Sequence, residues 1–135
     1  MSFKGNFTTD VFKTALLNAD VDFGSDTFKI ALYTNDAVLD QTTTAYTTDG
    51  EVVAFGYTAG GLTLTPTVSS LDGVSFVSFD DVSWSGVITA RGALIYKDGG
   101  IAVCVLDFGS DRTSATTFTV QFPPATNTTA ILRLN

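Results

Sequence analysis

The fold is decided by residues 87–108, which read Val87-Ile-Thr-Ala-Arg-Gly-Ala-Leu-Ile-Tyr-Lys-Asp-Gly-Gly-Ile-Ala-Val-Cys-Val-Leu-Asp-Phe108. Two strand-like apolar runs, residues 87–96 and 101–108, flank the segment Lys97-Asp-Gly-Gly100. Asp-Gly supplies the positive φ angles of a tight primed turn, so this stretch predicts an antiparallel β-hairpin.

In most of the chain around this hairpin, apolar residues recur at every second position, which is the side-chain period of a β-strand. Phe28, Ile30 and Leu32, for example, fall on one face of an early segment. Pro66 interrupts a later run and indicates an edge strand or a bulge. The further segments that we expect to form strands are residues 27–33, 51–55, 62–68, 75–79, 82–84, 118–122 and 131–134.

One early segment, at about residues 9–18, carries the signals of a helix. Thr8 and Thr9 can cap its start, and Phe12 and Leu16 lie four residues apart on one face. A helix of this length is marginal alone, so its apolar stripe must pack on a sheet.

These elements together predict a mainly β fold, an antiparallel β-sandwich or jelly-roll-like structure with one short N-terminal α-helix. We expect a single domain over residues 1–135 with an N-terminal arm at residues 1–7. Residues 34–50 are polar and rich in Thr and Asp, and they predict a long surface loop. Loops of this length are usually functional or mobile.

The composition excludes several classes of protein. The net charge of −7 argues against nucleic-acid binding, which needs clustered cations. The chain has no histidine, and its single cysteine, Cys104, cannot form an intramolecular disulfide and is expected to be a buried, inert thiol. No apolar stretch is long enough to cross a bilayer, and the first seven residues do not resemble a secretion signal, so we expect synthesis and folding in the cytoplasm.

Three acidic groups could in principle support metal binding or hydrolysis. Asp20-Val-Asp-Phe-Gly-Ser-Asp26 begins like an EF-hand loop but lacks its glycine and closing glutamate, and the two other groups, Asp80-Asp81 and Asp107…Asp111, are likewise short of calcium ligands. Asp80, Asp81 and Glu51 also offer raw material for a pair of catalytic carboxylates. Solvated turn carboxylates are the favoured interpretation. Gly56-Tyr-Thr-Ala-Gly-Gly61 lacks the lysine of a phosphate loop and predicts a turn with close backbone approach. We therefore expect no metal, no cofactor and no catalytic residue.

Three residues stand out as candidates for an interface. Phe3 and Phe7 lie in a polar arm, where they either staple the helix start to the sheet or anchor the arm on another subunit. Arg91, inside an apolar strand, either points to solvent or pairs with an aspartate in the core or at an interface.

The order of several short strings resembles a widespread family of small virion proteins of tailed bacteriophages. The strings are Ser25-Asp-Thr-Phe-Lys-Ile-Ala-Leu-Tyr33, Gly56-Tyr-Thr-Ala-Gly-Gly61, Thr89-Ala-Arg-Gly-Ala-Leu-Ile-Tyr96 and Val105-Leu-Asp-Phe-Gly-Ser110, together with the helix start Phe7-Thr-Thr-Asp-Val-Phe12 and Trp84. The chain departs from the family at Val53-Ala54-Phe55, where a further glycine often precedes the Gly-Tyr pair.

The resemblance implies a structural protein of the virion, in particular a capsid decoration (cement) protein. Such a protein binds the major capsid protein on the outer capsid surface as a homo-oligomer, a dimer or a trimer, without catalytic residues. A β-surface and the N-terminal arm would supply its binding energy, and its strong negative charge would keep free copies soluble.

Two other functions compete with this interpretation. A phage tail or receptor-binding component would recognise a host surface glycan, with residues 34–50 and 72–81 as candidate tip loops. An enzyme such as a glycan hydrolase would need two carboxylates close together in a cleft.

Overall fold

The computed structural model describes residues 6–134 and is mainly β, with antiparallel sheets and one short helix. The fold class predicted from the periodicity is therefore confirmed as β-sandwich-like, while its jelly-roll form stays a prediction. The elements are β1 (Phe7–Thr8), α1 (Asp10–Leu17), β2 (Phe28–Tyr33), β3 (Leu62–Leu64), β4 (Pro66–Leu71), β5 (Val74–Phe79), β6 (Val82–Ser85), β7 (Thr89–Lys97), β8 (Ala102–Thr113), β9 (Thr117–Val120) and β10 (Leu132–Leu134).

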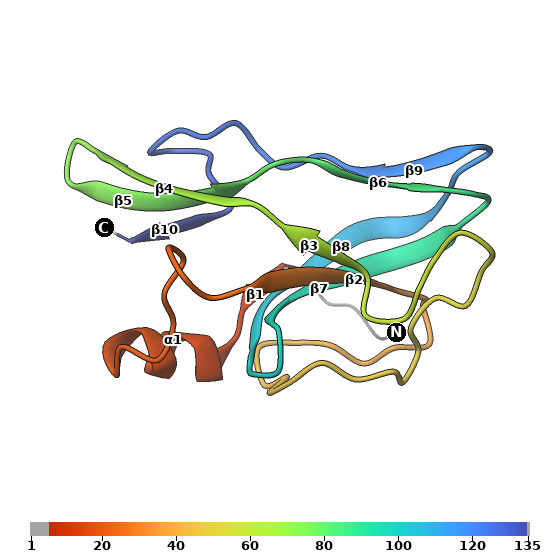
Figure 1. Ribbon diagram of the computed structural model, residues 1–135, viewed down its shortest axis with the longest axis horizontal. Helices are drawn as coiled ribbons and strands as arrows, with labels where there is room; N and C mark the ends of the chain where they lie inside the picture. The colour runs from red at the N-terminus through yellow and green to blue at the C-terminus, as the bar shows by residue number, and fades with distance from the viewer. Residues whose placement is uncertain (1–5, 135) are drawn as a thin grey trace.

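The strands form two layers (Figure 1). One layer is a five-stranded sheet in the order β1-β8-β7-β2-β3, and its centre is the predicted hairpin of β7 and β8. The other layer holds the three-stranded sheet β10-β5-β4 and the two-stranded sheet β6-β9. Every strand pair is antiparallel, as the sequence predicted.

The main core lies between these layers. Phe28, Ile30 and Leu32 of β2 are completely buried there, on the single face that their alternation predicted. Trp84 of β6 and Phe118 of β9 contribute from the second layer, and their rings lie 6.4 Å apart in an edge-on arrangement. Burial of these large side chains is the dominant source of stability for a domain of this size.

The opposite face of the five-stranded sheet is also buried. Tyr33 and Leu94 on this face pack against Ala37 and Leu39, both only 1% exposed, which lie in the segment that follows β2. The prediction of a surface loop at residues 34–50 was therefore wrong in part, because the segment has little regular structure but covers the sheet. The apolar stretch Ala37-Val38-Leu39 is too short to show a strand period within a polar run, so the sequence did not reveal this packing.

The helix begins where the sequence predicted. The Thr9 hydroxyl accepts a hydrogen bond from the backbone N–H of Phe12 at 3.2 Å, which satisfies one of the free N–H groups of the first turn. The same hydroxyl donates to the carbonyl oxygen of Ala102 in β8 at 2.7 Å. One completely buried threonine thus caps α1 and fixes it to the sheet.

Two local predictions were wrong. At the β7–β8 turn only Gly99, with φ 72°, has a positive φ, so Asp98-Gly99 does not form a primed turn. The primed geometry occurs instead in the β4–β5 hairpin, where Asp72 and Gly73 have φ values of 53° and 82°. Residues 51–55, expected to be a strand, make only an isolated bridge from Glu51 to Tyr33.

Candidate interaction surface

The single glutamate of the chain, Glu51, is buried among hydrogen-bond donors. Its Oε1 accepts a hydrogen bond of 2.5 Å from the Tyr46 hydroxyl. Its Oε2 accepts one of 2.5 Å from the Tyr57 hydroxyl and one of 2.8 Å from the backbone N–H of Gly60. A buried carboxylate is tolerated only when donors replace water, and these three donors do so. Glu51 therefore cross-links the long segment between β2 and β3.

The other two tyrosines tie the same segment to the central sheet. The Tyr33 hydroxyl donates to the carbonyl oxygen of Thr47 at 2.6 Å, and the Tyr96 hydroxyl donates to that of Gly60 at 2.6 Å. The Tyr96 ring also stacks on the ring of Tyr46 with a centroid distance of 4.8 Å. All four tyrosines of the chain thus hold one segment in place.

The same environment suppresses the acidity of these hydroxyl groups. Burial raises the pKa of Tyr96 to about 12, with the nearby carboxylates of Asp98 and Glu51 adding to the effect. Burial, and then the hydrogen bond to Glu51, raise the pKa of Tyr46 and of Tyr57 well above the usual value. The hydroxyls remain protonated donors at neutral pH, which suits them to positioning a segment.

Glycines then bring this segment close to its neighbours. A Cβ atom at Gly61 would lie 1.7 Å from the carbonyl oxygen of Ile30, and one at Gly56 would lie 1.9 Å from that of Ser85. Both positions also have a positive φ, 79° and 93°. The prediction of a turn with close backbone approach is confirmed, because only glycine fits at either contact.

The result is an exposed apolar surface at one end of the molecule. Val53 and Phe55 are each 97% exposed, and Val87, in the β6–β7 connection, is 66% exposed. The two segments touch, because a Cβ at Gly86 would lie 2.5 Å from the carbonyl oxygen of Phe55. Both lie at the end of the molecule far from α1 (Figure 1). We call Val53, Phe55 and Val87 the apolar tip.

The predicted interface residues in the N-terminal arm have separate outcomes. Phe3 lies outside the described residues. Phe7 is half-buried in β1, opposite Val105 of β8, and packs against the second core cluster. Of the two roles considered for Phe7, the observed contact favours the staple, since the ring binds the sheet of its own chain directly before α1.

Arg91 is buried, so the expectation that it could point to solvent was wrong. Its guanidinium donates to Oδ1 of Asp107 in the same chain, which realises the alternative of a pair with an aspartate. The pair lies at an irregularity of the β7–β8 ladder, where residues 108–111 stand opposite Arg91 alone. With 6% of its surface exposed, Arg91 has little area to offer a partner, and we leave it out of the apolar tip.

The candidate metal-binding carboxylates form hydrogen bonds and an ion pair within the chain. Oδ1 of Asp22 accepts the N–H of Gly24 at 2.8 Å, and Asp26 pairs with Lys97 at 3.2 Å. Oδ1 of Asp81 accepts the N–H of Phe122 at 2.8 Å. Within residues 6–134, no group of three or more His, Cys, Asp or Glu side chains could hold a metal ion.

The remaining candidate reactive group is Cys104, and it is buried in β8 as expected. Burial raises the pKa of its thiol to about 12, so the reactive thiolate is suppressed. In the described part of the chain, no helix combines the length and apolar character needed to cross a membrane.

Comparisons of the chain with protein-family models, with curated proteins and with solved structures found no match. The structure thus defines a class, a β-sandwich-like protein with an exposed apolar tip, and the function must be argued from its surface.

Sequence reasoning missed the apolar tip because the continuous apolar run at residues 52–55 was interpreted as a short strand. A signal was present in the glycines: Gly50, Gly56, Gly60 and Gly61 surround the segment. Such a density of glycine is typical of turns, and an apolar residue inside a turn has no strand neighbours to bury it.

Proposed function

We propose that this protein is a bacteriophage capsid decoration protein that binds the major capsid protein through the apolar tip. The observation that carries the proposal is the 97% exposure of both Val53 and Phe55 on a firmly anchored segment. Exposed apolar side chains are common singly, but a cluster on a rigid support marks an interaction site. The resemblance to small virion proteins supplies the identity of the partner.

Because the tip is anchored, more of the free energy gained by burying its side chains against a partner contributes to binding. Burying a valine or phenylalanine side chain is worth about 1.5–3 kcal/mol. Association offsets part of that gain, because mobile groups lose freedom on binding. The Glu51 and tyrosine hydrogen bonds, together with Gly56, have already ordered the segment during folding. If several linked copies bind neighbouring sites of the capsid lattice, a modest affinity of each tip gives a high overall affinity for the capsid.

A homo-oligomer is part of this proposal. Decoration proteins that act as dimers or trimers present several tips at once, which raises the effective affinity for a symmetric shell. Sedimentation of the purified protein gives its oligomeric state directly.

The test is the occupancy of purified capsids that lack this protein. We expect Phe55→Ser to lower the bound fraction at least tenfold, because about 2 kcal/mol of apolar burial is lost. Val38→Ser is the matched control, since Val38 is also strongly exposed, 78%, but lies outside the tip. A deletion of residues 1–5, which leaves β1 intact, measures the share of the N-terminal arm.

The outcomes are distinct. Loss of binding with Phe55→Ser but not with Val38→Ser supports docking through the tip. Loss of capsid binding only with the arm deletion would show that the arm, and not the tip, is the binding site. No capsid binding by the unaltered protein would reject the decoration function. The alternative of a tail or receptor-binding component stays a prediction, and binding of a host glycan by the isolated protein would favour it.

A further inference from the structure

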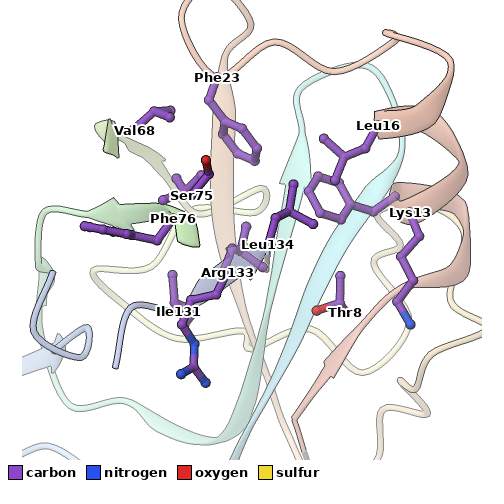
Figure 2. A pocket seen from close by; sticks show the side chains of 13 residues that line it. Thr8, Lys13, Leu16, Phe23, Val68, Ser75, Phe76, Ile131, Arg133 and Leu134 are labelled. Carbon is purple, nitrogen blue, oxygen red and sulfur yellow. The ribbon is translucent and has the colours of Figure 1, made fainter. Parts of the chain in front are cut away.

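An apolar groove is lined by residues of α1 and of β4, β5 and β10 (Figure 2). In Figure 1 these elements lie at the end of the molecule opposite the segments that carry the apolar tip. The groove has a volume of about 520 Å³ and separates α1 from the three-stranded sheet β10-β5-β4. Phe12 and Leu16 of α1 line it, together with Phe23. Phe76 of β5 and Leu132 of β10 contribute from the sheet.

The groove presents apolar side chains to solvent. Leu134 of β10 is 61% exposed and Val68 of β4 is 57% exposed, and both line it. Concave apolar surfaces of this size are typical of binding sites rather than of packing defects.

One wall of the groove also offers free backbone groups. β10 pairs with β5 on one side only, and within residues 6–134 no strand lies along its other edge. An edge strand carries unpaired N–H and C=O groups that can hydrogen-bond an added strand. The occupant best suited to this edge is therefore an extended polypeptide.

The charges at the groove favour an acidic occupant. Lys13 and Arg133 line it, and their cationic ends extend towards the same side in Figure 2. Arg133 also donates to the carbonyl oxygen of Thr128. Neither side chain forms an ion pair within the described residues, where the pairs are Arg91–Asp107 and Lys97–Asp26. A cationic groove on a chain of net charge −7 is a local exception.

We propose that this groove binds an extended segment of a partner protein, rich in apolar and acidic residues, which adds as a strand to β10. The arm of a second copy does not have this chemistry, because Met1-Ser-Phe-Lys-Gly5 carries a lysine and no acid. The inference concerns the opposite end from the apolar tip, so it holds or fails independently of the capsid proposal.

The probe is a capped hexapeptide of alternating valine and aspartate, titrated into the full chain and followed by the amide NMR shifts. We expect shifts concentrated in β10 and α1. The equivalent peptide of valine and lysine should bind more weakly, although the net charge of −7 attracts it to the molecule as a whole. This opposition separates recognition by the groove from nonspecific attraction.

Matched charge variants test the rim. The double substitution Lys13→Glu and Arg133→Glu should weaken binding of the acidic peptide about tenfold, since two surface charge contacts are lost and reversed. Lys29→Glu with Arg112→Glu makes the same change of net charge outside the groove and should have a much smaller effect. Unchanged Trp84 fluorescence shows that each variant is folded.

A third probe tests strand addition. The same acidic peptide with alternate amides N-methylated cannot donate a full ladder of hydrogen bonds, and we expect its binding to be lost. Equal binding of the methylated peptide, equal binding of the lysine peptide, or no binding of the acidic peptide would each overturn the proposal. Binding of decanoate alone would do so as well, because it would assign the groove to small amphiphiles.

Discussion

The five-stranded sheet is covered in two different ways on its two faces. On one face, Phe28 and Ile30 pack against a second layer of strands. On the other face, Tyr33 and Leu94 pack against a segment without regular structure that is held by Glu51. A strand layer satisfies its own backbone groups, whereas a loop must obtain its hydrogen bonds elsewhere. The difference explains why the polar network is found with the loop.

The two covers also have different consequences for function. The strand layer ends in short edges and a groove, while the glycine-rich loop extends its apolar residues Val53 and Phe55 into solvent. Ordering a loop costs conformational entropy, which the hydrogen bonds of Glu51 and the tyrosines offset. We infer that the anchoring of the loop cover depends on these hydrogen bonds, whereas the strand layer is held by its own strand pairing.

The largest expected effect comes from the strand-covered face. Phe28→Ala should lower the free energy of unfolding by about 3–5 kcal/mol, because it removes a completely buried aromatic ring and leaves a cavity. Phe55→Ala is the matched control and should change stability by less than about 0.5 kcal/mol, since its ring is 97% exposed. Denaturant unfolding followed by the fluorescence of the buried Trp84 measures both. Similar losses for the two variants would contradict the assigned core.

The second prediction concerns the loop-covered face. Glu51→Ala should cost about 3 kcal/mol, because it leaves two tyrosine hydroxyls and the N–H of Gly60 without their acceptor. Glu51→Gln, which retains one acceptor oxygen, should cost about 1–2 kcal/mol. Hydrogen exchange locates the effect: the amides of Thr34 and Val52, which bond to Gly50 and Leu32, should exchange faster.

A matched control is Asp49→Asn, which removes a carboxylate from the exposed surface of the same segment. It should leave both the stability and the exchange rates unchanged. If Glu51→Ala accelerated exchange equally in β5 and in the loop, the two covers would unfold as one unit and the comparison would fail.

The sequence predicted the strand-covered face well. The alternation of Phe28, Ile30 and Leu32 is produced by the same geometry that buries one side of a strand, and Thr9 caps the helix for a reason that is local. These features depend on residues that are close in the sequence, so they could be predicted from the sequence alone.

The loop-covered face and the apolar tip could not be predicted in the same way. Ala37 and Leu39 are buried by contacts with β7 and β8, which are distant in sequence, and Glu51 is buried because tyrosines from several segments meet there. Arg91 and Asp107 likewise form their ion pair only because β7 pairs with β8. Long-range pairing leaves no period in the sequence.

The third prediction uses pH to separate the two faces. Cys104 lies on the strand-covered face, and burial raises its pKa to about 12, while the usual value of a free thiol is about 8.5. Tyr96 lies on the other face, and burial raises its pKa to about 12 from a usual value of about 10. Between the unfolded and folded pKa values, the unfolded chain loses protons first, so stability falls as the pH rises.

Stability should therefore decline above about pH 8.5 by up to 1.4 kcal/mol per pH unit from the thiol, and more steeply above about pH 10 as the tyrosines join. Cys104→Ala should remove only the first decline. The measurement is denaturant unfolding at a series of pH values, together with the tyrosinate absorbance. Appearance of tyrosinate in the folded protein near pH 10 would contradict the buried network.

The smallest expected effect lies in a turn of the strand layer. Gly73 has φ 82° in the primed β4–β5 turn, and a Cβ added there would meet nothing within 4 Å. Gly73→Ala should therefore cost only the backbone strain of the left-handed region, about 1 kcal/mol. Asp72→Asn, which retains a side chain that tolerates the positive φ of 53°, should be nearly neutral. Gly61→Ala adds a steric clash to the backbone strain, because the added Cβ would lie 1.7 Å from the carbonyl oxygen of Ile30. Thermal unfolding of Gly73→Ala and Gly61→Ala side by side separates conformation from contact, and equal losses would show that the close approach contributes nothing.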